Sequence, residues 1–494
     1  MTNRTSFGLR GFSRVARFLA PVAAAAGLLA ASEGTASAQE WLKDRRYAEG
    51  QGIRVGDLEL HPGIGGEVGY DSNWFLRTHR TAPAPNEFVN GPPNNEAVGA
   101  GVLRLTPSFS ISTLSQQRLE GSEGAGGGPP PVAFRAGIAA TYREFLGEQQ
   151  IRDQRNISGN AFARVDINQQ RPIGVGIFAN YTRLIQPSVV ADPNLSFNRS
   201  DVGGGAEVIV IPGGGTLDMR AGYQIFGALF EESQGAPFTN ITHEISIKNR
   251  WKFRPRTALF HDTSLRFINY PNANRSLNYL NDSTPLRTRF GITGLLTERF
   301  GALAAVGYGA TFFKNGNAPS TFQYDSINAQ LEGTFYLSQA PGSLEPGQVT
   351  LLLSTLTFGF VRDFQNSLLG NYYDSNKGYL RLVYNFGGRA IIQLDGYFEA
   401  LGFPQPFYTA GGGPVAVTGL DGQPTGDFTN FRAGGVLFTE YRFTDVFGVN
   451  ASVDYQQMIS DTALAAGAGA GGANQFFDLN WRRIQAFAGV RLFW

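Results

Sequence analysis

Apolar and polar residues alternate along many long stretches of this chain. In the stretch 447–456 the odd positions from Phe447 to Tyr455 are apolar, and the even positions are polar or glycine. The stretches 241–253 and 327–337 follow the same plan. Because successive side chains of a β-strand point to opposite faces, the alternation predicts strands with one apolar and one polar face. A soluble sandwich also alternates, but its strands are shorter and need a second packed sheet.

Eighteen such segments can be counted. They lie near residues 58–73, 98–115, 132–145, 155–168, 172–184, 200–211, 215–230, 239–253, 256–270, 285–298, 301–313, 321–337, 348–363, 375–387, 389–400, 428–443, 446–459 and 480–494. Long polar connectors alternate with connectors that are mostly tight turns. In a bilayer only helices and closed barrels pair every backbone polar group, and bacterial barrels have long loops outside and short turns inside. We therefore predict an all-β fold, a transmembrane outer-membrane antiparallel β-barrel of about eighteen strands, with short periplasmic turns, long extracellular loops and both termini in the periplasm.

The first 38 residues are typical of an export signal. Four arginines within 4–17 precede an apolar stretch at 18–31, and Ala36-Ser37-Ala38 matches the A-x-A cleavage pattern. We expect a cleaved signal peptide at 1–38, a short periplasmic segment at 39–57 and the barrel at 58–494, in the outer membrane of a Gram-negative bacterium. The alternative is a retained anchor helix.

The last strand carries a second export-related feature. Trp494 ends the chain, and Leu492 and Val490 share its parity. This resembles the C-terminal signal by which the barrel-assembly machinery recognises outer-membrane barrels. The resemblance implies two partners, the assembly machinery and the lipids of the outer membrane. The alternative is an aromatic residue that ends the strand by chance.

Composition argues against catalysis. The chain has no Cys, so it has neither disulfides nor thiolate metal sites, and a formal net charge of +1 gives no reason to expect nucleic-acid binding. Of its four histidines, His243 and His261 have lipid-facing parity, and His79 falls in the first long loop. The run 467–472 matches G-x-G-x-x-G in form only, and we interpret it as a flexible linker because no helix follows it. We expect a protein that is not an enzyme and that needs no cofactor or metal.

The polar parity of the strands is rich in charge. Candidate pore-lining residues are Arg135, Arg143, Arg164, Arg220, Arg250, Arg266, Arg287, Arg289, Arg381, Arg432, Arg442, Arg483, Arg491, Asp166, Asp262, Glu332, Asp395, Glu399, Glu440 and Asp454. Charges of both signs on adjacent strands favour ladders that brace a wide barrel. The alternative is a conduit whose arginines attract anionic solutes. Inward aromatics, Phe162, Phe178, Tyr336, Tyr397 and Phe487, are either stacking surfaces for sugars or space-filling groups.

Barrels of this size enclose an aqueous channel unless something fills them. The segment before the first strand is too short for a folded plug. A constriction must therefore come from the long loops, above all 74–97 and 401–427, or from the short N-terminal segment.

The start of the barrel carries a short motif. Residues 52–62 lead into Gly69-Tyr70-Asp71-Ser72-Asn73-Trp74-Phe75, and this looks like the opening of the beta-barrel porin 2 group, in which Tyr-Asp-x-Asn ends the first strand. Within that group the chain is most similar to barrels associated with secretion of exopolysaccharide or capsule. The resemblance implies an 18-stranded porin that passes a polysaccharide chain outward with a periplasmic polysaccharide-export protein. It assigns Tyr70, Asp71 and Asn73 no role.

The sequence leaves three functions open. The first is export of an exopolysaccharide or capsular polysaccharide, which rests on analogy. The second is a general or solute-specific diffusion porin. The third is a surface adhesion or structural barrel whose lumen is blocked by loops, and an outer-membrane hydrolase is a distant fourth.

Overall fold

The computed structural model describes 52–78, 97–113, 131–168, 172–185, 198–231, 236–273, 281–314, 324–337, 354–366, 372–386, 389–404, 417–419, 427–468 and 474–494. All of them belong to the compact unit Trp41–Trp494. The signal peptide predicted at 1–38 and most of the segment predicted at 39–57 lie outside these ranges.

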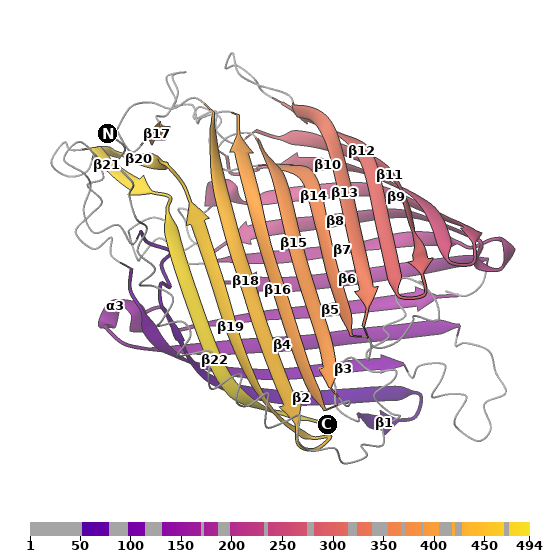
Figure 1. Cartoon of the computed structure of the whole chain (residues 1–494), viewed down its shortest axis with the longest axis horizontal. Helices are drawn as coiled ribbons and strands as arrows, with labels where there is room; N and C mark the ends of the chain where they lie inside the picture. The colour runs from indigo at the N-terminus through magenta and orange to yellow at the C-terminus, as the bar shows by residue number, and fades with distance from the viewer. Residues whose placement is uncertain are drawn as a thin grey trace, which may run out of the picture. The chain divides into compact units, whose positions relative to one another are not determined.

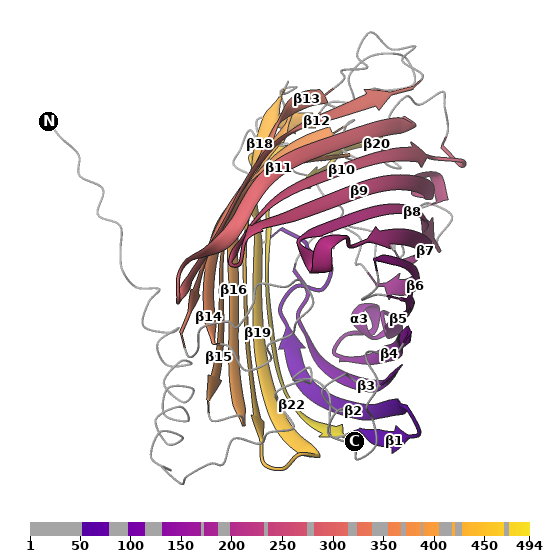
Figure 2. The same ribbon diagram turned by 90° about the vertical axis from the view of Figure 1, so that its right-hand side faces the viewer.

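Eighteen described strands form one closed antiparallel sheet (Figure 1). They are β2 (Leu58–Asp71), β3 (Ala100–Thr113), β4 (Val132–Leu146), β5 (Asn156–Ile167), β6 (Ile173–Leu184), β7 (Arg199–Val210), β8 (Leu217–Phe230), β9 (Asn240–Arg254), β10 (Thr257–Asn269), β11 (Ser283–Thr297), β12 (Phe300–Phe313), β13 (Tyr324–Tyr336), β14 (Thr355–Asn366), β15 (Tyr372–Phe386), β16 (Ala390–Phe403), β18 (Phe428–Arg442), β19 (Phe447–Ile459) and β22 (Trp481–Phe493). Each pairs with the next, and β22 pairs back with β2, which closes the barrel. Figures 1 and 2 show β14, β15, β16, β18, β19 and β22 as one wall that faces the wall of β3–β9.

The prediction of an antiparallel barrel of about eighteen strands is confirmed. Every predicted segment contains one of these strands, and most boundaries agree within three residues. The start predicted at 348 for the thirteenth segment falls on residues that the structure does not describe. The pattern works because a strand between lipid and water keeps strict alternation over its full length.

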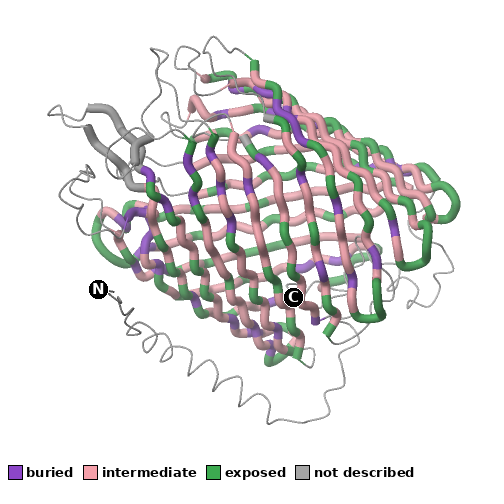
Figure 3. The backbone as a smooth tube through the Cα atoms, turned by 45° about the horizontal axis from the view of Figure 1, so that its top comes forward, coloured by how far each residue is buried: buried purple, intermediate pink, exposed green. Residues whose placement is uncertain are grey.

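One face of the sheet is apolar and the other polar. Directly opposed residues of an antiparallel pair point to the same side, and the exposed apolar residues share one parity, as with Val68 opposite Leu103. Exposed and partly buried positions alternate along the strands (Figure 3). The other parity holds the charged groups described below.

Three features were not predicted. β1 (Ile53–Val55) pairs with β2 inside the segment predicted as a periplasmic tail. The turn α3 (Gln149–Arg152) follows β4, and Figure 2 shows it on the inner side of that strand. β17 (Val417–Gly419), β20 (Thr462–Ala468) and β21 (Asn474–Asp478) form a small separate sheet from two predicted loops. The linker interpretation of 467–472 is therefore wrong at its start, because Ala468 at the end of β20 pairs with Asn474.

No helix in the described ranges has the length and apolar character needed to cross a membrane.

Candidate functional site

The structure places all twenty candidate pore-lining residues on the inward face. For example, Glu67 on β2 faces Arg104 on β3, which faces Arg143 on β4, and all three oppose the apolar outer parity. The same register argument applies strand by strand to the rest of the set. The five inward aromatics predicted from parity lie on this face as well. What these residues do for a solute remains a prediction.

Most of the inward arginines form ion pairs with carboxylates. Ion pairs join Arg164 to Asp166 and Glu207, Arg220 to Asp218, Arg266 to Glu244, Arg287 to Asp363, Arg289 to Asp262, Arg381 to Asp395, Arg432 to Glu399, Arg442 and Arg491 to Glu440, and Arg483 to Asp71. Several of these pairs bridge neighbouring strands, as with Arg289 and Asp262, whose atoms lie 2.9 Å apart. This arrangement favours bracing over a continuous ladder of free cations.

Cations stand over the rings of two inward aromatics, Phe487 and Tyr397. The guanidinium of Arg104 lies 3.3 Å from the ring centroid of Phe487, and the ammonium of Lys377 lies 4.4 Å from that of Tyr397. The Nε of Arg432 donates to the Tyr397 hydroxyl at 3.0 Å. These two rings serve as platforms for cations of the wall, which favours their space-filling role over sugar stacking.

Asp71 is the centre of a buried polar cluster at the seam where the barrel closes. Its side chain is 0% exposed and accepts hydrogen bonds from Nε and Nη2 of Arg483 and from the amide of Gln485, both on β22. It also accepts the backbone N–H of Asn73 at 3.0 Å. The carboxylate therefore ties the first strand, the last strand and the start of the first loop together.

Asn73 continues the same cluster into the loop. Its side-chain amide donates to the carbonyls of Arg77 at 2.7 Å and Arg482 at 2.9 Å, and its side-chain oxygen accepts the N–H of Arg77. Tyr70, in contrast, faces outward and is 53% exposed. The two buried polar positions of the Tyr-Asp-x-Asn motif thus build a backbone anchor.

The anchored segment 72–78 lies on the inner side of the barrel. Trp74 and Phe75 are 4% and 2% exposed, and they join a cluster with Phe145, Phe487 and the α3 residue Ile151. Because Phe145 and Phe487 are inward-facing wall residues, this cluster fills part of the lumen. Burial lowers the pKa of Arg77 in the same segment. The prediction that loop 74–97 constricts the lumen is tested only over 74–78 and 97, since 79–96 lie outside the described residues.

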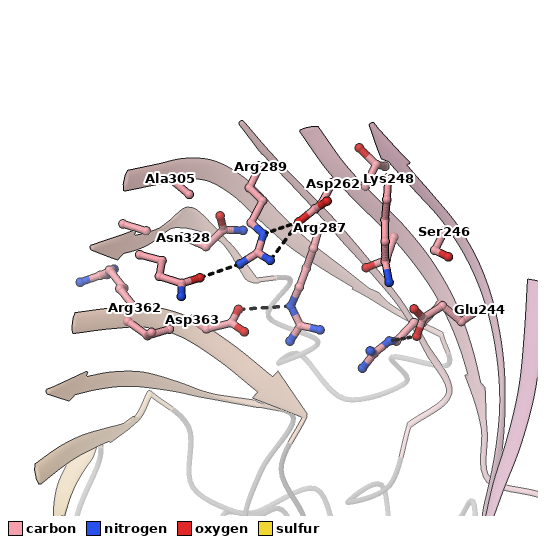
Figure 4. Close-up of a pocket in the computed structure, with 16 residues that line it drawn as sticks. Glu244, Ser246, Lys248, Asp262, Arg287, Arg289, Ala305, Asn328, Arg362 and Asp363 are labelled. Atoms are coloured by element: carbon pink, nitrogen blue, oxygen red, sulfur yellow. Dashed lines mark hydrogen bonds and ion pairs between the residues drawn. The ribbon is translucent and has the colours of Figure 1, made fainter. Parts of the chain in front are cut away.

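A separate hollow of about 290 Å³ lies on the inward face of β9–β14 (Figure 4). Its charged lining consists of Glu244, Lys248, Asp262, Arg266, Arg287, Arg289, Arg362 and Asp363. Strand parity already points Lys248 and Glu244 inward, whereas sequence analysis did not single out Arg362 or Asp363. Arg362 has outward parity by register, so alternation alone gave no signal for its place in the hollow.

Parity also left other inward charges unassigned. Glu207 on β7 accepts from Arg164, and Glu67 on β2 lies near Arg491 at 3.9 Å. On the inward parity of β7, Glu207 follows two glycines, Gly203 and Gly205. The alternation signal was therefore weak there.

Three histidines lie in the described ranges, and His61 among them lies 3.5 Å from the carboxylate of Glu59 on the same strand. His243 lies 2.7 Å from the hydroxyl of Tyr223 on the outward face, and His261 stacks on Phe290. Within the described ranges, no group of three or more His, Cys, Asp or Glu residues is placed to hold a metal ion. His79 lies outside those ranges.

Comparison with known proteins gives similarity in structure only. No family model matches the chain, and none of the curated proteins matches it. Among solved structures, the chain is similar to the outer membrane protein opdK from Pseudomonas aeruginosa, with 10% identity, a TM-score of 0.41, and 88% of this chain and 99% of that chain covered. It is also similar to the FrpB iron transporter from Neisseria meningitidis, with 8% identity, a TM-score of 0.42, and 93% and 83% covered. Acinetobacter baumannii OccAB4 gives 9% identity, a TM-score of 0.41, and 88% and 98% covered.

The fold that the structure shows is a closed antiparallel β-barrel. At these identities the similarity says nothing about a substrate, so function is argued from this chain's own residues.

Proposed function

We propose that this protein is a diffusion channel for small hydrophilic solutes in the outer membrane of a Gram-negative bacterium. The closed ring of eighteen strands is of a size that encloses an aqueous lumen unless loops fill it. This assignment takes the porin alternative of the sequence analysis as the main function.

The observation that carries the proposal is exposed charge on the inner face. Arg381 and Asp395 face inward, and their side chains are 62% and 44% exposed. Arg289 also faces inward and is 43% exposed. Charged groups are costly to bury without water or full pairing, so a wall of this kind supports a water-filled passage.

Conductance of the purified, folded protein in planar bilayers tests the proposal. We expect steady single-channel conductance without any partner protein. Folding is checked first by heat-modifiable migration on SDS gels. Folded protein that inserts and gives no conductance contradicts the proposal and supports the third alternative, a barrel blocked by its loops.

Location and processing form a separate part of the proposal. We propose export with removal of 1–38, which mass measurement of the protein isolated from outer membranes tests directly. A mature chain that begins near Gln39 supports it, and a chain that retains the first 38 residues contradicts it.

Polysaccharide export is the second candidate function. The Tyr70, Asp71 and Asn73 motif supports it, through its resemblance to barrels associated with exopolysaccharide secretion. The test is a clean deletion with rescue by the intact gene, followed by measurement of polymer at the surface and in the periplasm. Loss of surface polymer with retention inside supports export through a periplasmic export partner, whereas unchanged surface polymer contradicts it and leaves the solute channel standing.

A further inference from the structure

The hollow on β9–β14 exists because two neighbouring strands separate. β13 begins at Tyr324 and β14 ends at Asn366, yet their pairing stops at Ala329 opposite Arg362. The end of β14 instead approaches β11, where Arg287 lies 3.2 Å from Asp363 and its guanidinium stands over the Phe364 ring. The displaced end of β14 forms one wall of the hollow.

Positive charge exceeds negative charge in this hollow. Five cations line it, Lys248, Arg266, Arg287, Arg289 and Arg362, against three carboxylates, Glu244, Asp262 and Asp363, which leaves a local charge of +2. This contrasts with the ion-paired wall elsewhere in the lumen.

The excess can be assigned to two residues. Each carboxylate is engaged by one arginine, as Glu244 is by Arg266 at 2.6 Å. Within the described residues, no carboxylate lies at ion-pair distance from Lys248 or Arg362. Arg362 makes only long hydrogen bonds, to Asn376 at 3.4 Å and Ser326 at 3.5 Å. Both groups therefore lack a countercharge, and Arg362, although its parity is outward, borders the hollow at the point where β13 and β14 stop pairing.

We propose that this hollow binds a small hydroxylated organic dianion on its way through the channel. Lys248 and Arg362 supply the two charges that match the ligand. Ser246, Ser264 and Asn328 also line the hollow and offer partners for hydroxyl groups. Figure 4 shows Lys248 and Arg362 on opposite sides of the labelled group, with the Arg289–Asp262 pair between them.

The volume limits the ligand. A hollow of about 290 Å³ lies near the lower end of the range for small-molecule sites. It therefore suits a sugar acid or a hydroxylated dicarboxylate.

The inference deepens the proposed channel function, and its test separates the two. Tartrate serves as the probe because it is a hydroxylated dianion of suitable size, with neutral erythritol as its matched control. Binding to the folded full-length protein in detergent is measured by calorimetry, and conductance is measured independently in bilayers.

The decisive variant is Lys248→Gln with Arg362→Gln. Lys377→Gln is its matched control, because Lys377 also faces the lumen but lies outside the hollow. We expect salt-sensitive tartrate binding, weakened at least about tenfold in the double variant through loss of two Coulombic partners, and changed less than about twofold in the control. Erythritol should not bind.

Three outcomes overturn the dianion site: no tartrate binding to the wild type, equal affinity in the double variant, or equal loss in Lys377→Gln. Conductance without tartrate binding contradicts only the proposed binding site and leaves the proposed channel standing. Binding without conductance leaves the site intact and contradicts the channel.

Discussion

Asp71 accepts hydrogen bonds from Nε of Arg483 at 3.0 and 3.1 Å and from its Nη2 at 2.5 Å, across the seam between the first and last barrel strands. The Asp71 side chain is 0% exposed and that of Arg483 is 12% exposed. A buried ion pair between residues 412 positions apart thus joins the two strands that close the barrel.

Asp71→Asn is expected to destabilise the barrel by roughly 3 kcal/mol, because it leaves Arg483 buried without its countercharge. The double variant Asp71→Asn with Arg483→Gln should recover part of that loss. The measurement is the midpoint of urea unfolding followed by gel migration. Asp218→Asn is the control, since Asp218 pairs with Arg220 within one strand and is more exposed. Equal loss in Asp71→Asn and Asp218→Asn contradicts the role of the seam.

Replacement of both Trp74 and Phe75 by Ala is expected to raise single-channel conductance. The two side chains are the loop's contribution to the cluster that fills part of the lumen. Replacing each by Ala costs about 3–5 kcal/mol of packing free energy, so the loop segment should no longer be held in the passage. Tyr70→Ala provides the control, because Tyr70 faces outward in the same motif. Unchanged conductance in the loop variant would show that the segment does not limit the passage.

Alternation predicted the strands and the inward side of their charges, but not the partners of those charges. Partner choice depends on register and on side-chain reach, as with Arg491, which contacts Glu440 two strands away at 3.1 Å. The hollow was beyond prediction because it depends on the local separation of β13 from β14. The inner cluster was missed because Trp74 and Phe75 open a long polar segment, and their burial depends on wall residues distant in sequence.

Glu207→Gln is expected to shift ion selectivity towards anions. Glu207 lies between Arg164 and Arg220 on the inward face, so its neutralisation releases positive charge into the lumen. The anion-to-cation permeability ratio, taken from the reversal potential in a salt gradient, should rise by roughly two- to threefold at low salt, where screening is weak. Arg164→Gln should move the ratio in the opposite direction. A shift of the same sign in both variants would mean that the variants act through altered structure.

The pair formed by Arg183 and Glu231 is expected to contribute stability only above acidic pH. Hydrogen bonds from Arg183, at 2.6 and 2.7 Å, lower the pKa of the Glu231 carboxyl, which lies just beyond the end of β8. A lowered folded pKa means that the contribution is present above the unfolded pKa and is lost as pH falls through the folded value. The free energy of unfolding should differ little between wild type and Glu231→Gln at neutral pH, by less than about 1 kcal/mol for a partly exposed pair. The difference should vanish on acidification. A difference that grows as pH falls would contradict this sign.

Trp494→Ala is expected to reduce the amount of folded barrel in the outer membrane more than it reduces stability in vitro. The backbone N–H of Trp494 donates to the carbonyl of Pro62 at 3.0 Å, a bond that Ala retains, while its side chain is 43% exposed on the outward parity. The aromatic group is therefore accessible on the outward face, and the prediction that 490–494 serves as an assembly signal assigns it a role in assembly rather than in folded stability. Trp251→Ala is the matched control, because Trp251 is also outward and 51% exposed. Quantification of heat-modifiable protein in outer-membrane fractions measures assembly, and unfolding of refolded protein measures stability. Equal loss of assembled protein in both variants would assign the effect to the loss of any outward tryptophan and would remove the assembly role from Trp494.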